Sequence, residues 1–298
     1  MKRLLAVIGA CCAVAFLRAA PAPVEDKAQL LIVSTRDGKA DIFLVNADGT
    51  GEPKRLTDGK STNAYPAWSP DRKKIAFASD RDGSMNIYVM DADGSNVKQL
   101  TKGAAVSRVP CWSPDGKQIA FCRRSPATSS EICIMDADGG NVKVVGSGGD
   151  AFDPTWSPDG KKILFTSFRA AGGGFRLYVM DTDGGNVKQL TNIRNTLGYV
   201  YPSWSPDGKK VTWAEWLNPG LEIYVADPDG KNAKQLTKLG GNNAYPGWSS
   251  DGKKIVFHHW GNDGSGAYYM MDADGDNQKE LFKKEPPVEG GRPVWRPK

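Results

Sequence analysis

One motif, written six times, constrains this chain more than any other feature. Residues 66–73 read Pro-Ala-Trp-Ser-Pro-Asp-Arg-Lys, four near-copies follow, and a shortened copy at residues 293–298 ends the chain. The copies carry the tryptophans Trp68, Trp112, Trp156, Trp204, Trp248 and Trp295, which stand 44 to 48 residues apart. Self-similarity at this period is typical of propellers and solenoids, so it governs how the rest of the sequence is interpreted.

Each copy also carries its own turns. Ser-Pro-Asp-Gly places proline where a type I turn needs a φ of about −65° and glycine where φ is positive, which predicts a hairpin with a glycine bulge. In the first full copy, apolar runs follow at residues 74–77 and 86–90, and Lys-Gln-Leu-Thr ends the copy at residues 98–101. One repeat is therefore four short strands joined by three turns. No window long enough for a helix shows apolar residues at 3.6 spacing, so we predict an all-β fold.

A second motif counts the repeats independently. Asp/Asn-x-Asp-Gly occurs six times, ending at Gly49, Gly94, Gly139, Gly184, Gly230 and Gly275. The two series are offset, because the first copy, from Leu30 to Thr57, lacks the Pro-x-Trp strand and the last copy consists of that strand alone. A linear solenoid would leave unpaired edges, whereas a ring lets Val294 and Trp295 complete the blade begun at Leu30. The sequence therefore predicts a six-bladed β-propeller with four antiparallel strands per blade, closed by the C-terminal strand.

The strands and turns of the repeat suggest how it packs. Apolar runs such as Ile-Leu-Phe at residues 163–165 are nearly continuous, as expected for strands covered on both faces by neighbouring blades. We expect the repeated tryptophan to wedge between blades in a structural role. Arg72 stands where four other copies have glycine, so we expect a positive φ and some backbone strain there.

The repeat also resembles that of a known family. Pro-x-Trp-Ser-Pro-Asp-Gly-Lys, followed by Ile-x-Phe, Ile-Tyr-Val-Met-Asp-x-Asp-Gly and Leu-Thr, is similar to the PD40 (WD40-like) repeat of TolB-type propellers, over roughly residues 28 to 298. The resemblance implies a periplasmic or exported six-bladed propeller that binds proteins. TolB has an α/β domain before its propeller; about 27 residues precede the first expected strand here, so we expect this chain to lack that domain.

The start of the chain has the features of a signal peptide. Basic Lys2 and Arg3 precede an apolar core at residues 4–17, which is too short to span a bilayer comfortably. We expect a signal peptide at residues 1–22, a linker at 23–27 and the propeller at 28–298. In an alternative interpretation, Ile-Gly-Ala-Cys at residues 8–11 is a lipobox and Cys11 is lipidated. Either version predicts a periplasmic or secreted protein.

Charge gives little support to a nucleic-acid partner. Without the three basic residues of the signal, 36 basic residues stand against 34 acidic ones, a net charge of +2. The lysines are spread through the turns of every blade instead of forming one basic face, so we expect no nucleic-acid binding. We expect a monomer that meets its partner at one face of the ring.

Three cysteines follow the predicted signal, on three successive strands of one blade. They are Cys111, Cys122 and Cys133, and an odd number leaves at least one thiol without a disulfide partner inside the chain. Two interpretations stay open. The cysteines are either small buried apolar residues, or two of them form a cross-strand disulfide.

Signals for metal or catalytic chemistry have simpler structural explanations. The Asp-x-Asp-Gly turns cluster oxygens that suit calcium, but Asp and Asn also bond to their own backbone in tight turns. His258 and His259 are the only histidines, and neighbours on a strand point to opposite faces, which excludes a metal site built on several histidines. Gly-x-Ser-x-Gly is absent from the sequence. We therefore expect no metal, no cofactor and no catalytic residues.

Variation among the blades indicates where function lies. Two loops of each blade open on one face of the ring, and the residues before the repeat prolines are Tyr65, Val109, Asp153, Tyr201, Tyr245 and Arg292. We expect these six to ring the channel mouth. Aromatic residues and arginine are enriched at binding hot spots. The predicted partner-binding set is Tyr65, Arg108, Asp153, Tyr201, Tyr245, Arg292, Trp216, His259 and Trp260.

These observations favour an exported TolB-like propeller that acts as a non-catalytic protein- or peptide-binding platform in the cell envelope. The alternative is a propeller enzyme of lyase or hydrolase type acting on an envelope or extracellular glycan, with Asp153, Tyr201 and Arg292 as conceivable site residues. A structural envelope component is a third possibility. The channel mouth discriminates between them, because an enzyme needs paired acid–base groups within reach of one substrate atom.

Overall fold

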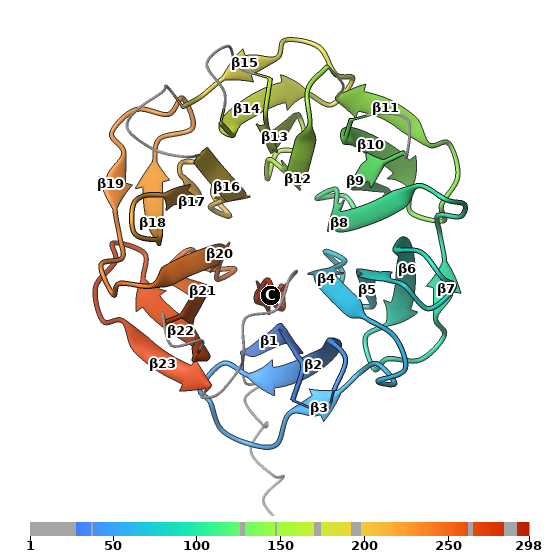
Figure 1. Cartoon of the computed structure of the whole chain (residues 1–298), viewed down its shortest axis with the longest axis horizontal. Coiled ribbons are helices and arrows are strands. Elements are labelled where there is room, and N and C mark those ends of the chain that lie inside the picture. Colours follow the sequence, from blue (N-terminus) through green and yellow to red (C-terminus); the bar gives the residue numbers. More distant parts are fainter. Residues whose placement is uncertain are drawn as a thin grey trace, which may run out of the picture.

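In this computed structural model the chain is described at residues 28–36, 38–125, 129–146, 148–169, 174–191, 198–261, 265–282 and 291–297. These residues form 24 strands in six four-stranded sheets arranged as a ring (Figure 1), which confirms the predicted all-β, six-bladed propeller. No helix long and apolar enough to cross a membrane occurs in them. The predicted signal peptide (1–22), the linker (23–27) and Cys11 lie outside the described residues.

Each blade has the same strand order from the ring axis outwards. Blade 1 contains β24 (Val294–Trp295), β1 (Gln29–Ser34), β2 (Asp41–Asn46) and β3 (Lys54–Arg55). Blade 2 contains β4 (Asn63–Trp68), β5 (Lys74–Ser79), β6 (Asn86–Asp91) and β7 (Lys98–Gln99), and blade 3 contains β8 (Val106–Trp112), β9 (Gln118–Arg124), β10 (Glu131–Asp136) and β11 (Lys143–Gly146). Blade 4 contains β12 (Ala151–Trp156), β13 (Lys162–Ser167), β14 (Arg176–Asp181) and β15 (Lys188–Gln189). Blade 5 contains β16 (Gly198–Trp204), β17 (Val211–Trp216), β18 (Leu221–Ala226) and β19 (Lys234–Gln235), and blade 6 contains β20 (Asn242–Trp248), β21 (Lys254–Trp260), β22 (Gly266–Asp272) and β23 (Lys279–Phe282).

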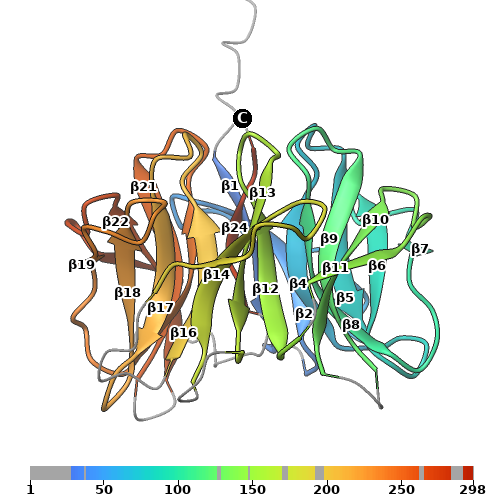
Figure 2. The same ribbon diagram turned by 90° about the horizontal axis from the view of Figure 1, so that it is seen from above.

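The strands run between the two faces of the ring (Figure 2). Since neighbouring strands in a blade are antiparallel, both the Ser-Pro-Asp-Gly and the Asp-x-Asp-Gly turns fall on one face, which we call the turn face. The loops between the second and third strands, and the links between blades, fall on the other, which we call the loop face. The repeated motifs therefore mark the turn face, and the loops that vary among blades mark the loop face.

The C-terminal strand closes the ring as predicted. β24 pairs antiparallel with β1, with Trp295 opposite Leu30 and Val294 opposite Leu31. The backbone N–H of Arg296 donates to the Gln29 carbonyl at 2.9 Å and extends the pairing by one bond. Leu30 and Leu31 are fully buried, so the last residues of the chain cover part of the first blade's core.

The repeated tryptophans connect neighbouring blades, as the sequence predicted. Three indole N–H groups donate to a backbone carbonyl of the preceding blade, namely Trp112 to Ala67 at 3.2 Å, Trp156 to Cys111 at 3.1 Å and Trp295 to Gly247 at 3.1 Å. In each case the acceptor directly precedes that blade's own tryptophan. One side chain thus fills the gap between two blades and fixes the register between their inner strands.

Hydrogen bonds inside the turns explain why their residues repeat. In the Ser-Pro-Asp-Gly turns the serine hydroxyl donates to the aspartate, as in Ser113 to Asp115 at 2.7 Å. The predicted conformation at Arg72 is confirmed, since its φ is 63° and that of Gly116 in the next blade is 70°. Arg72 therefore takes the left-handed conformation that its glycine counterparts adopt without steric cost.

The Asp-x-Asp-Gly turns use their own carboxylates, as the hairpin interpretation predicted. Asp93 accepts from the Ser95 N–H at 2.9 Å, and Asp91 accepts from the Asn96 amide at 2.6 Å and from the Lys74 ammonium at 2.5 Å. The Lys74 ammonium and the Asn96 amide hold the pKa of Asp91 below its usual value. The clustered oxygens are thus engaged by groups within the turn and on the adjacent strand.

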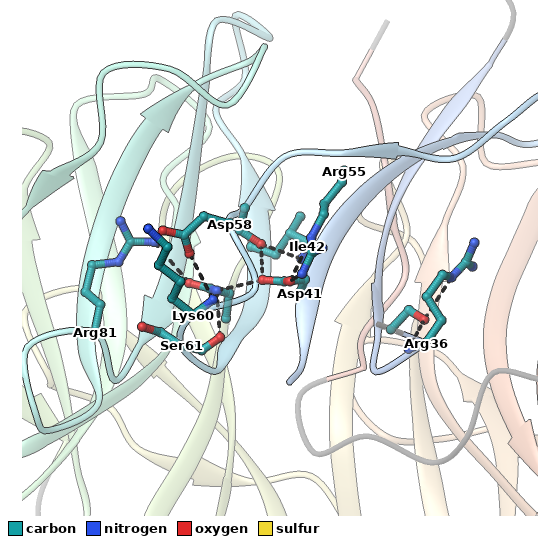
Figure 3. Close-up of polar contacts among 11 residues, drawn as sticks. Arg36, Asp41, Ile42, Arg55, Asp58, Lys60, Ser61 and Arg81 are labelled. Carbon is teal, nitrogen blue, oxygen red and sulfur yellow. Dashed lines mark hydrogen bonds and ion pairs between the residues drawn. The ribbon is translucent and has the colours of Figure 1, made fainter. Parts of the chain in front are cut away.

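A buried polar network joins blades 1 and 2 (Figure 3). Asp41, the first residue of β2, accepts from the Thr57 hydroxyl at 2.6 Å and from the Asn63 amide of the next blade at 2.8 Å, and it forms an ion pair with Arg55. The Thr57 hydroxyl also accepts from the Ile42 N–H at 3.0 Å, which accounts for the Leu-Thr that ends this repeat. The same threonine-to-backbone bond recurs between Ile87 and Thr101, Leu177 and Thr191, and Ile223 and Thr237.

The three cysteines of blade 3 are free thiols, which decides between the two interpretations left open by the sequence. Cys111 lies opposite Ala120, Cys122 opposite Ile132 and Cys133 opposite Phe121, so no two of them face each other across strands. Cys122 and Cys133 are buried, and burial raises their pKa to about 12 and about 11. They act as small buried side chains.

Candidate functional site

Five inner strands share an unusual backbone feature at the residue before the repeat proline. These residues have φ between 53° and 57° and are Tyr65, Val109, Asp153, Tyr201 and Tyr245. At each of them the pairing between first and second strands shifts by one residue, which defines a β-bulge. A positive φ in a non-glycine residue is uncommon, and in β-branched Val109 it is a genuine outlier. Such strain persists where the surrounding structure imposes it, and it gathers at functional sites.

The bulges place these residues inside the channel, not at its mouth. Tyr65 is the third of six residues in β4, and Val109 is the fourth of seven in β8. The residues that we predicted to ring the channel mouth therefore lie near the middle of the inner strands. The inner strands begin two or three residues before the bulge, so the ring of pre-proline residues lies about half-way between the two faces.

Side chains from neighbouring blades meet at this level. Tyr201 of blade 5 packs against Tyr245 of blade 6, with ring centroids 4.0 Å apart and the rings tilted by 34°. Burial raises the pKa of Tyr201 far above its usual value, and Tyr245, Asp153 and Tyr65 of the opposite blade 2 raise it further. Tyr201 and Tyr245 thus pack on each other at the level of the bulges.

Asp153 is the acidic member of this group. Burial raises its pKa to about 6, although Arg292 of the opposite blade 1 acts in the other direction. Its carboxylate accepts a long hydrogen bond from the Tyr201 N–H at 3.4 Å. Asp153 therefore has one long hydrogen bond and the positive charge of Arg292 to stabilise its ionised form.

A cavity of about 630 Å³ lies on the loop-face side of these pre-proline residues. Tyr65, Val109, Asp153 and Tyr201 form its floor. Its walls come from the ends of strands and loops on the loop face, and include Val106, Arg108, Arg124, Phe152, Phe175, Val200 and Trp216. Four of the six blades contribute, so the cavity is an off-centre funnel that opens on the variable face.

The sequence as a whole matches a family model described as the TolB beta propeller domain, over residues 10–174 and 169–297. The chain belongs to the TolB β-propeller family. No protein of curated function matches the sequence significantly.

Solved structures agree with this membership. The crystal structure of TolB from Acinetobacter baumannii is 27% identical with a TM-score of 0.78, and the match covers 91% of this chain and 67% of that one. A putative TolB from Agrobacterium tumefaciens is 21% identical with a TM-score of 0.72, covering 91% and 97% of the two chains. An oligogalacturonate lyase in complex with manganese is 18% identical with a TM-score of 0.61, and the match covers 89% of this chain and 77% of that one. The propeller fold therefore occurs in an enzyme as well as in TolB.

In this TolB-type propeller, five of the nine predicted partner-binding residues line the cavity together. They are Tyr65, Arg108, Asp153, Tyr201 and Trp216. Trp216, at the end of β17, is 45% exposed and stands on the rim. The structure thus brings together residues that are up to 151 positions apart in the sequence.

The other four predicted residues do not line the cavity. Tyr245 is 6% exposed and packs with Tyr201, and Trp260 is packed against the same apolar cluster. His259 places Nδ1 at 2.9 Å from the Asn243 side-chain oxygen. The positive charge of Arg292 lowers the pKa of Asp153 and so opposes the effect of burial.

Several lining residues were missing from the predicted set. Phe175 packs edge-to-face on Phe152, with centroids 5.9 Å apart, and on Phe168 at 5.4 Å. The sequence feature that could have identified Phe175 is its position directly after three glycines, at residues 172–175. Thr166, which is 1% exposed, lines the cavity from β13, and its hydroxyl has no hydrogen-bond partner in the described part of the chain.

Charge is distributed unevenly around the cavity. Arg108 and Arg124 line it from blade 3, whereas Phe152, Phe175 and Trp216 line it from blades 4 and 5. Asp153 is the one carboxyl group among the described lining residues. Across the described residues as a whole, no group of three or more His, Cys, Asp or Glu side chains is arranged to hold a metal ion.

Proposed function

We propose that this chain is an exported, non-catalytic platform of the cell envelope, which binds a protein or peptide segment in the loop-face cavity. The observation that carries the proposal is the cavity itself, about 630 Å³ in volume and lined by aromatic and arginine side chains from four blades. Pockets of this size that combine apolar walls with a few polar groups are typical ligand sites. Tyrosine, tryptophan and arginine also supply most hot-spot energy at protein interfaces.

The make-up of the cavity supports binding over catalysis. Glycan cleavage by acid–base chemistry uses two groups that act on one bond, usually two carboxyl groups. The described lining residues include Asp153 as their one carboxyl group and no histidine. Tyr201, its neighbour, has a pKa raised far above the physiological range by burial, so its phenol keeps its proton. The glycan-acting enzyme is therefore the weaker candidate.

Membership of the TolB family supports a protein-binding role in the envelope in general. The basic and apolar pattern of residues 1–22 adds export to the proposal. Association with a membrane would then come from the partner or from a lipid on Cys11. Mass spectrometry of the protein purified from its native host would test this, since a cleaved chain starting between residues 19 and 23 is expected, or one starting at a lipidated Cys11.

Site-specific crosslinking tests the binding face. A photo-reactive phenylalanine analogue at Trp216 should crosslink an envelope protein, and the same analogue at Asp93 on the turn face should not. With the captured partner, Tyr201→Ala combined with Trp216→Ala should weaken binding by at least about 2 kcal/mol, the hot-spot threshold, in calorimetry. Asp93→Ala is the matched control and should leave binding unchanged. Loss of binding in the control alone would place the interface on the turn face.

A further inference from the structure

We propose that the loop-face cavity recognises the free C-terminus of a partner polypeptide whose last residue has a large apolar side chain. This inference rests on the proposed binding function and specifies which part of a partner enters the cavity. It follows from the size of the cavity, its floor, and the two opposed kinds of wall.

Size and floor indicate that a chain end enters. A volume of about 630 Å³ is that of a site for a drug-sized ligand, which corresponds to a few amino-acid residues. Tyr65, Val109, Asp153 and Tyr201 line the cavity at its channel end, and Tyr245 packs on Tyr201 with ring centroids 4.0 Å apart. A loop would bring two chain segments side by side, spaced by about 5 Å, into the same volume, whereas a chain end needs room for one segment. The volume therefore favours one chain end.

The wall from blade 3 indicates a negative end group. Arg108 lies opposite Cys122 and Val106 lies opposite Arg124, so all four side chains project from one face of this sheet. All four line the cavity. Long side chains on diagonal cross-strand positions can reach one another, so both arginines can contribute positive charge to one carboxylate, and the exposed Arg124 offers it a forked donor.

The neighbouring arginine shows how specific this arrangement is. Arg123 precedes Arg124 on β9 and projects from the other face, where it forms an ion pair with Glu131 at 3.4 Å. Arg124 is exposed, and no carboxylate is within ion-pair distance of it in the described part of the chain. A carboxylate in the cavity would supply this counter-charge. At this wall an amino terminus would instead meet two like charges, since Asp153, the one carboxyl group of the described lining, comes from blade 4.

The opposite wall indicates the type of side chain at that end. Phe152 and Phe175 form an edge-to-face pair, with Trp216 on the rim. An apolar or aromatic side chain of the last residue would pack on them while its carboxylate reaches blade 3. The Thr166 hydroxyl, buried and without a hydrogen-bond partner among the described residues, lines the same cavity and is available to a backbone amide group of the peptide.

Short synthetic peptides test the proposal. The probes are twenty fluorescein-labelled tetrapeptides that differ in their last residue, each made with a free carboxylate and as the C-terminal amide. Fluorescence polarisation with the purified full chain should show the tightest binding for Phe, Trp, Leu and Met ends. Amides should bind at least tenfold more weakly, since each lost charge-assisted contact contributes about 1.4 kcal/mol or more.

Two neighbouring arginines provide the matched variants. Arg124→Gln should weaken binding of the free acids at least tenfold and leave amide binding unchanged, whereas Arg123→Gln should alter neither by more than twofold. Circular dichroism checks that both variants fold. Equal losses in the two variants would overturn the proposal, because a general effect of positive charge would then explain them.

The remaining outcomes separate this inference from the proposed function. If acids and amides bind equally, or if no peptide binds although a partner crosslinks at Trp216, the C-terminal recognition is refuted and the binding platform stands. If no peptide binds and crosslinks form only from Asp93 on the turn face, both proposals fail.

Discussion

The closure of the ring by two residues of β24 gives a quantitative prediction. Trp295 is half-buried and its indole N–H donates to the Gly247 carbonyl at 3.1 Å. Truncating a fully buried tryptophan costs about 3–5 kcal/mol, and the partial exposure of this one reduces the expected loss. Trp295→Ala should therefore lower the free energy of unfolding by about 2–3 kcal/mol. Trp156→Ala, at a residue only 7% exposed, should reach the full range.

Trp295→Phe separates the two contributions, because it keeps most of the apolar contact and removes the hydrogen bond to Gly247. It should cost about 1 kcal/mol, the usual net value of one bond. Urea denaturation followed by far-ultraviolet circular dichroism measures all three variants. A surface change such as Lys161→Ala is expected to stay within about 0.5 kcal/mol of the wild type. If Trp295→Ala were as mild as that control, closure by β24 would not stabilise the ring and our reasoning would be refuted.

Three further predictions concern single sites. Arg72→Gly should raise the free energy of unfolding by about 0.5–1 kcal/mol in the same assay, because relief of the left-handed backbone exceeds the added flexibility of the unfolded chain. Burial raises the pKa of Asp153 from 3.8 to about 6, so ionisation of this carboxyl group destabilises the folded protein as pH rises through that range. The free energy of unfolding of Asp153→Asn should therefore rise relative to that of the wild type by up to about 3 kcal/mol between pH 4 and pH 7. A relative stability independent of pH would contradict this. Cys111, Cys122 and Cys133 should all react with a thiol reagent after unfolding without reductant and react slowly before it, whereas two missing thiols would reveal a disulfide.

The architecture could be predicted from the sequence because each blade repeats its own signals. The period of the tryptophans, the two turn motifs and the offset between their series were enough to predict six blades and the pairing of Trp295 with Leu30. Even the backbone conformation of Arg72 followed from comparison with its glycine counterparts. Local interactions determine these features, and the sequence repeats the corresponding motifs often enough for the pattern to be recognised.

The site could be predicted only in part, because it depends on differences between blades. Tyr65 and Tyr201 were recognised because the residue before the repeat proline varies among the blades, but their position in the inner strands depends on bulges that cross-strand pairing produces. Tyr245 has the same place in its repeat as Tyr201, yet packing against neighbouring side chains keeps it out of the cavity. Nothing in the repeat that contains Thr166 marks it as a site residue, because its place in the cavity wall depends on side chains from other blades.

The left-handed bulge before five of the repeat prolines has a consequence for how such a ring diversifies. The same backbone distortion occurs at Tyr65, Val109 and Asp153, so it does not depend on which side chain the position carries. Five of the six blades thus offer the same backbone position on the inner strand for a variable side chain, whether an aromatic ring, a branched alkyl group or a carboxylate. A substitution at this bulge position alters the lining of the channel, while the strands, the turns and the tryptophans that join the blades stay as they are. Selection can therefore change the ligand preference of the ring one position at a time, with little effect on the stability of the fold.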